Sequence, residues 1–490
     1  MWVKPGQVTI FMMLIFMVIL SLLAAQYHSS IFYACRADAE RAARLSAESF
    51  LAAYQRPLRD RYQILAVDGG FGGDTFQQER LEEYLLQVYE KNMESGLTKK
   101  NVEAIAMEEP IFTMLIDGDW DFFVREITLN RKAALVSDGL ELLLGQWKKN
   151  NDRASEDLQQ KRMTAENSAT EENMGEEEIG REQQQVRDPR DTLMAIWNQG
   201  ILAAACPENF HVSEKECVMT DVSYPEAGKR IQAAIDFKDG ASIQNLFGKW
   251  DEILDMENSI RSVAEEAAVH MYIGEVFKNA VTDGDNGAQQ ESVLKYEMEY
   301  IIGGNETDME NMKNVLWKIL AIRCVMNLSY ILMSPEMNMQ VMETAGLLST
   351  ALLLPQFTEV IGFLLKSAWA FTEALADCRT LLKGGKIPVI KTKDTWYLSW
   401  DQMFRLNASV LDGNRGEQGL DYSGYLHILL ATTKPETKYR RMTHLMEKNI
   451  RLIDGYEDFR MKYCIYGIQA RFNYDSHGFG SHDVQTALSY

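Results

Sequence analysis

The residues whose spacing most directly suggests chemistry are two cysteines. Cys206 and Cys217 lie eleven positions apart and enclose the polar segment ACPENFHVSEKEC. If this part of the chain lies outside the cell, a disulfide between them would close the loop and contribute roughly 2–3 kcal/mol of stability. A zinc site would need more ligands than these two thiols and His211. A disulfide is therefore the chemistry that we expect here.

No other group of residues matches a catalytic or cofactor-binding signature. The glycine cluster Gly69–Gly73 lacks both the spacing of a dinucleotide loop and a following Lys-Ser or Lys-Thr pair, so we interpret it as a turn. Gly384–Lys386 lacks the upstream glycine of a phosphate loop and is typical of a helix end. We therefore assign no catalytic, cofactor-binding or metal-binding residue and do not expect an enzyme. The other cysteines lie in apolar patterns and are expected to be buried: Cys35, Cys324, Cys378 and Cys464.

The element that would position the rest of the chain is an apolar segment near its start. Val8–Ala25 has eighteen residues without a charge. As a helix it would reach roughly 27 Å, which is enough to cross the hydrocarbon core of a membrane. A cleaved signal peptide is the alternative, with Lys4 as its basic flank and Ala24-Ala25 as its small residues, but such apolar regions usually run about 7–15 residues. We therefore predict a single transmembrane helix, with the lipid bilayer as a partner.

This helix is predicted to continue beyond the membrane. Gln26–Tyr54 contains no glycine or proline and is rich in good helix formers, and Pro57 is the first helix breaker after the apolar segment. One helix from Val8 to Tyr54 would be on the order of 70 Å long. Its outer half carries small residues that would let it pack closely on a folded body: Ala39, Ala42, Ala43 and Ala47.

The distribution of charge bears on partners and location. The chain has 490 residues, of which 50 are basic and 71 acidic, for a formal net charge of −21. A nucleic acid would repel such a surface, so we expect no nucleic-acid partner. The first 60 residues hold six basic and four acidic side chains, which leaves 44 basic and 67 acidic for the rest. An acidic body is repelled by the anionic inner leaflet, so we expect a single-pass protein of the cell membrane with its body outside.

The body is predicted to be α+β, predominantly helical, with a small antiparallel sheet. Tyr463–Asp475 alternates between apolar and polar residues, as a half-buried strand does, and we expect it to pair with a strand at Arg61–Asp68. The other elements expected before the middle of the chain are two strands, at Val102–Met107 and Ile111–Ile116, and two helices, at Gln77–Asn92 and Phe122–Trp147.

Two apolar helical stretches in the second half of the chain could be mistaken for further membrane spans. Met312–Leu332 repeats apolar residues at helical spacing, but Lys318 and Arg323 interrupt it. Ala345–Leu365 is broken by Pro355, and we predict a buried helical hairpin that bends there. Both stretches are therefore interpreted as core helices.

These patterns divide the chain into seven segments. The charged insert (148–195) has too few apolar residues to form a core and is expected to be disordered. The polar tail (476–490) is also expected to be disordered. The cationic stretch Lys438–Arg451 is interpreted as a solvated helix face. The segments are a short leader (1–7), a transmembrane segment (8–25), its helical extension (26–57), an α+β subdomain (58–147), the charged insert (148–195), a mainly helical domain with a C-terminal strand (196–475) and the tail (476–490).

Several segments together resemble one family of Gram-positive bacterial proteins, DUF5702. The likeness lies in the apolar start and its extension, and in the segments DFFVREITLNRKA, LKYEMEYIIGGNETDMENM, AWAFTEALADCRTLLKGGKIPVIKT and GLDYSGYLHILL. The family has no established activity, and its genes tend to accompany the Tad/Flp pilus machinery. The resemblance therefore implies a membrane location and association with Tad/Flp pilus assembly proteins.

The start of the chain is also similar to that of TadE- and TadG-like pseudopilins, in which a glycine precedes the apolar helix and a glutamate follows five residues later. Gly6 matches the glycine, which implies prepilin-type processing between Gly6 and Gln7, but Phe11 stands where the glutamate belongs. We therefore favour an uncleaved, membrane-anchored extracellular accessory or structural protein of a Tad-like pilus or secretion apparatus. The alternative is an envelope ligand-binding protein or enzyme whose site is not visible in the sequence.

Overall fold

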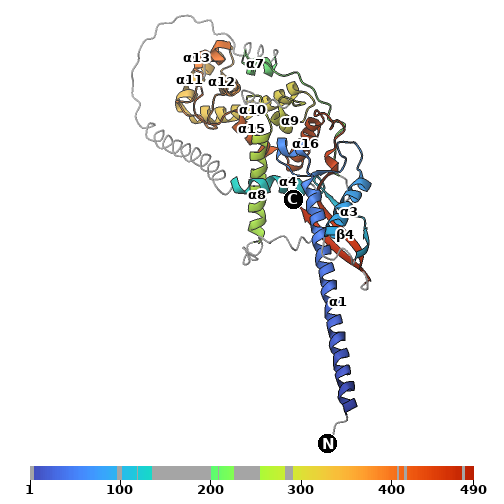
Figure 1. Ribbon diagram of the computed structural model, residues 1–490. Coiled ribbons are helices and arrows are strands. Elements are labelled where there is room, and N and C mark those ends of the chain that lie inside the picture. The colour runs from blue at the N-terminus through green and yellow to red at the C-terminus, as the bar shows by residue number, and fades with distance from the viewer. Residues whose placement is uncertain are drawn as a thin grey trace. The chain divides into compact units, whose positions relative to one another are not determined.

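The structure is a computed structural model (Figure 1), and it describes residues 5–95, 102–118, 120–134, 200–207, 209–225, 254–281, 291–404, 408–412, 416–476 and 480–490. The chain forms two compact units. The first unit draws on 1–127, 222–259 and 446–490, and the second on 128–221 and 260–445. The fold is α+β and predominantly helical with a small antiparallel sheet, as predicted.

The first unit begins with one long helix, α1 (Pro5–Ala52), which confirms the unbroken rod that the sequence predicts. Its 48 residues reach about 72 Å at the rise of an α-helix. The exposure of its side chains changes along its length. Every residue from Thr9 to Ser30 is exposed, and this half extends away from the sheet (Figure 1). In the outer half the predicted small residues are buried: Ala39, Ala42, Ala43 and Ala47.

Small side chains bring the outer half of α1 close to its neighbours. Helix α3 (Gln78–Ser95) packs along it, and the Ser46 hydroxyl donates a hydrogen bond of 2.7 Å to the carbonyl oxygen of Leu85. The ring of Tyr89 on α3 stacks on Phe472 of the sheet, with 4.1 Å between the ring centroids. The outer half of α1 therefore forms one wall of the hydrophobic core of this unit.

In the described part of the chain, five strands form the antiparallel sheet of the first unit, and β4 (Cys464–Ser476) pairs with all of the others. The pair of Val67 with Ile465 confirms the predicted contact between the first and the C-terminal strands. The strand predicted over Arg61–Asp68 was too long, because its first two residues belong to helix α2 (Arg56–Tyr62) and only Val67–Asp68 is extended. On β4 the predicted alternation buries Ile468, Ala470 and Phe472. The partner strands are β1 (Val67–Asp68), β2 (Val102–Met107), β3 (Ile111–Met114) and β5 (Gly480–Ser489).

The end of the chain differs from the prediction of a disordered tail for residues 476–490. Strand β5 pairs along β4 from Gly467 to Ser476. Val484 is buried and Leu488 packs against the core that α1 covers, so alternate side chains of this segment face inward. The polar residues between them hid this period. Residues 446–490 accordingly belong with the start of the chain rather than with the helical domain predicted over 196–475.

Shorter elements complete the first unit. Helix α2 (Arg56–Tyr62) follows α1, and the 3₁₀ turn η5 (Met461–Tyr463) precedes β4. The carboxylate of Asp68 accepts hydrogen bonds from the backbone N–H groups of Gly70 and Gly72, at 2.9 and 2.7 Å. These bonds confirm that the glycine cluster forms a turn.

Helices build the second unit. The boundary between the units divides three helices, α4 (Asp121–Ala134), α8 (Leu254–Val276) and α16 (Pro435–Ile450). The others are α7 (Ile201–Ala205), α9 (Glu297–Gly303), α10 (Asp308–Met333), α11 (Pro335–Ala351), η4 (Pro355–Phe357), α12 (Thr358–Leu382), α13 (Trp400–Met403), α14 (Ala408–Leu411) and α15 (Tyr422–Thr432). Gly384 follows α12 with a φ of +80°, which agrees with the predicted helix end.

The longest helices of this unit, α10 and α12, pack against each other along their lengths. Helix α10 is long and apolar enough to cross a membrane, yet 39% of its most apolar window is buried. It also carries the buried polar residues Asp308, Arg323 and Asn327. These features are those of a core helix, as predicted.

Helices α11 and α12 form the predicted hairpin, which bends at Leu352–Phe357 around Pro355. The prediction that this hairpin is buried was wrong at its end. Leu353 and Phe357 are both exposed, and only the residues that face α10 and α13 are enclosed, Val341, Ala345 and Leu365 among them. The hairpin is apolar on two sides, one that packs against the core and one that is exposed.

The insert 148–195 and the end of the helix predicted over Phe122–Trp147 lie outside the described residues.

Candidate functional sites

The exposed half of α1 is the feature of the first unit that most clearly needs an external partner. Thr9–Ser30 carries no charged side chain. At 1.5 Å per residue it would extend about 33 Å, close to the thickness of a hydrocarbon core. None of the most apolar window of α1 is buried inside the protein. This helix is therefore a candidate membrane span.

The predicted processing site lies at the start of the same helix. Gly6 and Gln7 are in the first turn of α1, and Phe11, which replaces the pseudopilin glutamate, is exposed one turn further on. Cleavage between Gly6 and Gln7 stays a prediction.

The two cysteines of the predicted disulfide are separate thiols in the structure. Cys206 ends α7, and burial raises the pKa of its thiol to about 11. Cys217 belongs to a different contact, because its backbone N–H donates to the carbonyl oxygen of Glu306 and the preceding Glu216 pairs with Thr307. Each cysteine is thus held by a separate part of the unit. The structure does not contain the expected bond between them.

Four buried charged side chains of the second unit form a cluster, which we call the ion cluster: Arg323, Glu373, Asp377 and Lys391. Arg323 comes from α10, and its Nη2 lies 3.0 Å from Oδ2 of Asp377 on α12. Lys391 Nζ lies 2.7 Å from Oδ1 of the same carboxylate and also contacts Glu373, one helical turn earlier on α12. All four side chains lie in the protein interior, and the two positive charges match the two negative ones.

The ion cluster fastens the segment that follows α12 to the helices. Arg323 Nη1 donates to the carbonyl oxygens of Pro388 and Val389, at 2.8 and 2.7 Å. The carboxylate of Glu373 accepts the backbone N–H groups of Tyr397 and Leu398, at 2.9 and 2.8 Å. These bonds satisfy polar groups that would otherwise be buried without partners.

The two carboxylates of the ion cluster respond differently to their surroundings. Burial raises the pKa of Glu373, and the neighbouring Asp377 carboxylate adds to this effect. Burial acts in the same direction on Asp377, but Lys391 and Arg323 outweigh it and hold the pKa of Asp377 below its usual range. An enclosed, charge-balanced cluster of this kind is suited to fixing the register of helices.

Another buried carboxylate, Glu299 on α9, forms no ion pair with any residue that the structure describes. Its Oε1 accepts the Tyr422 hydroxyl at 2.9 Å and the Ala280 backbone N–H at 3.0 Å. Its Oε2 is buried without a hydrogen-bond partner among the described residues. Burial raises the pKa of Glu299 to about 7, because the carboxylate loses its hydration.

This shift predicts a pH dependence of stability. The folded protein holds the Glu299 proton up to about pH 7, whereas the unfolded chain releases it near pH 4.5. The stabilisation is therefore complete below pH 4.5 and is lost as the pH rises to about 7. We expect the free energy of unfolding, relative to Glu299→Gln, to fall by about 3 kcal/mol across this range. Urea unfolding of both proteins at several pH values measures it, and a constant difference would contradict the expectation.

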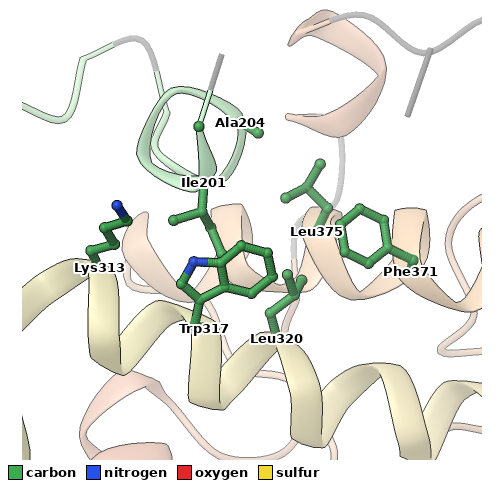
Figure 2. A pocket seen from close by; sticks show the side chains of 8 residues that line it. Ile201, Ala204, Lys313, Trp317, Leu320, Phe371 and Leu375 are labelled. Atoms are coloured by element: carbon green, nitrogen blue, oxygen red, sulfur yellow. The ribbon is translucent and has the colours of Figure 1, made fainter. Parts of the chain in front are cut away.

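One pocket of about 240 Å³ lies in the second unit, between α7, α10 and α12 (Figure 2). The indole of Trp317 and the ring of Phe371 line it together with Leu320 and Leu375, while Lys313 stands at its edge (Figure 2). Lys313 is the only ionisable residue in this lining. The pocket therefore offers a mainly apolar surface. In the ranges that the structure describes, no three His, Cys, Asp or Glu residues are placed to hold a metal ion.

The cationic stretch Lys438–Arg451 differs from the prediction of a solvated face. Lys438 is buried, and its Nζ lies 2.6 Å from Glu266 and 2.8 Å from His270 on α8. Arg441 donates to the carbonyl oxygen of Ile301 at 2.7 Å. Lys438 and Arg441 therefore bind acceptors far away in the sequence, and no local pattern indicates such pairs.

The comparisons with known proteins identify a family. No curated protein and no solved structure matches the chain. A protein family described as a family of unknown function, DUF5702, matches residues 179–476, which is more than half of the chain and includes the whole ion cluster. This is the family that the sequence segments resemble, and the chain belongs to it.

Proposed function

We propose that this protein is a single-pass membrane protein with an extracellular body, and that it serves as an accessory or structural component of a Tad-like pilus or secretion apparatus. Helix α1 would be both its anchor and the spine on which the first unit is built.

The observation that carries this proposal is the change in side-chain exposure along α1. The apolar residues from Thr9 to Ser30 are exposed, and the same helix becomes a buried wall of the core from Cys35 onward. An exposed apolar rod of this length is unfavourable in water and favourable in lipid, where an α-helix satisfies its own backbone. Because the helix is continuous, the first unit would be held close to the membrane surface.

The outside location and the pilus association have separate support. The acidic body is repelled by the anionic inner leaflet, which favours the outer side. The pilus association rests on family membership and on the resemblance of the apolar start to TadE- and TadG-like pseudopilins. Phe11 in place of the glutamate favours a stand-alone anchored protein over a polymerising subunit, because it removes the carboxylate that would mark subunit registration.

Affinity capture from detergent-solubilised membranes tests the association. The tagged full chain is expected to recover Tad/Flp pilus assembly proteins. The matched control is the same chain with residues 9–30 replaced by an unrelated apolar helix of equal length. Recovery by both chains assigns the contact to the body, and recovery by the native chain alone assigns it to the span. Recovery of no Tad component by either chain would contradict the proposed association.

A further inference from the structure

A second exposed apolar surface lies at the end of the α11–α12 hairpin. We call it the hairpin tip; its core is formed by Leu347, Leu352, Leu353, Leu354, Phe357 and Val360, all of which are exposed in the described part of the chain. Leu353, at the apex, is 85% exposed. Further apolar side chains, Phe363 and Leu364, continue the surface along α12. Single exposed leucines are ordinary, but a contiguous group of this size indicates an interaction site.

The threonine hydroxyl groups of the hairpin tip donate to backbone carbonyl groups, and Gln356 is an exposed polar side chain at the bend. No charged residue occurs between Glu343 and Glu359. The hydroxyl of Thr350 donates to the carbonyl oxygen of Gly346 at 2.8 Å, and that of Thr358 donates to Pro355 at 2.7 Å. The tip thus combines apolar side chains with hydroxyl groups that need no water, which is what contact with hydrocarbon requires.

The backbone of Leu353 adopts a conformation that is unfavourable for leucine. Its φ is +58°, in the left-handed region where glycine or asparagine is usual after a helix. A leucine there costs roughly 1 kcal/mol more than a glycine. A strained and almost fully exposed leucine contributes nothing to the core, so the strain points to a role outside the fold.

We infer that the hairpin tip inserts into the outer surface of the lipid bilayer. The inference rests on the proposed function, because the anchor is what keeps the body near a membrane. The apolar residues occur on both helices and around the bend. Lipid acyl chains can contact all of them because they are fluid, whereas a protein partner would need a groove of matching shape. About six residues of each helix, or about 9 Å, carry the surface, a depth typical of interfacial insertion. Glu359 is the one charged residue within 347–364, and it lies in the first turn of α12, where the helix dipole favours a carboxylate.

A lipid photolabel tests this inference. The full chain is reconstituted into phosphatidylcholine–phosphatidylglycerol vesicles that contain a phospholipid with a diazirine in its acyl chain. After irradiation, mass spectrometry of peptides should find acyl-chain adducts in two places, residues 9–30 and residues 347–364. In Leu353→Asp the adducts at 347–364 should fall about tenfold, because an aspartate at this position opposes insertion. Aspartate adopts the left-handed region more readily than leucine, so this variant should fold.

The outcomes separate the inference from the proposed anchor. Val218→Asp replaces another exposed apolar residue of the second unit and should leave both sets of adducts unchanged. Adducts confined to residues 9–30 would overturn the inference and leave the anchor standing. Adducts confined to the tip would support the inference and count against the anchor. Cross-linking of the tip to a second copy, in place of lipid, would also overturn it.

Discussion

Replacing both Leu14 and Val18 by arginine is expected to release the chain from the membrane. Both side chains are exposed in the apolar half of α1. Each charge near the centre of a membrane helix costs about 2.5–3.5 kcal/mol, so the pair costs roughly 5–7 kcal/mol. Most of the native chain should resist alkaline carbonate extraction of membranes, and most of the double variant should be extracted.

A control with the same spacing separates lipid contact from general damage to the helix. Tyr33 and Ala37 are also exposed and four residues apart, but they lie in the outer half of α1. Arginine at both positions should leave the chain in the carbonate-resistant fraction. If the Leu14/Val18 variant remains there as firmly as this control, α1 does not anchor the chain.

Replacing Lys391 by methionine is expected to destabilise the second unit by about 3–5 kcal/mol. The change removes one positive charge from the ion cluster and leaves Glu373 and Asp377 with only Arg323 to balance them. An uncompensated charge in a protein interior accounts for losses of this size. Urea unfolding of the full chain in detergent micelles, followed by tryptophan fluorescence, measures the loss.

The neighbouring Lys393 provides a matched control two residues away. It pairs with Glu336 at 2.8 Å, but both side chains are 74% exposed. Exposed pairs of this kind contribute about 0–1 kcal/mol, so Lys393→Met should be close to neutral. The double change Lys391→Met with Glu373→Gln restores charge balance and should recover part of the loss. Equal effects at Lys391 and Lys393 would show that the ion cluster does not stabilise the unit.

The elements that could be predicted from the sequence are those whose signal is local. The continuity of α1 follows from a long run without glycine or proline. Its small residues indicate close packing, which the structure shows against α3. Strand β2 begins and ends as predicted, at Val102 and Met107. The pairing of β1 with β4 could also be inferred, because the two strands lie near the ends of the body, but the length of β1 could not.

The features that escaped prediction depend on contacts between distant residues. Arg323 and Asp377 are 54 positions apart, and from the sequence Arg323 only interrupts an apolar pattern. Lys438 meets Glu266 across 172 positions, so its stretch looked solvated. Strand β5 was missed because polar residues occur on both of its faces: His482 shares the inward face with Val484, and Asp483 and Gln485 lie on the other.

The hairpin shows a further limit of hydropathy. A run of leucines indicates removal from water, but it does not say whether protein or lipid replaces the water. The tip and the exposed half of α1 carry the same signal, although the first was interpreted as core and the second as a span. Only the exposure of the side chains in the fold separates such cases.

The most direct test of the account is trypsin treatment of intact, wall-stripped cells, followed by mass spectrometry of the fragments that stay in the membrane. We predict that the protease digests the body from outside. It should leave a protected fragment that contains residues 9–30 and ends between Arg36 and Arg59, because no arginine or lysine lies between Lys4 and Arg36. A body that stays intact until the cells are lysed would place it inside the cell and contradict the account.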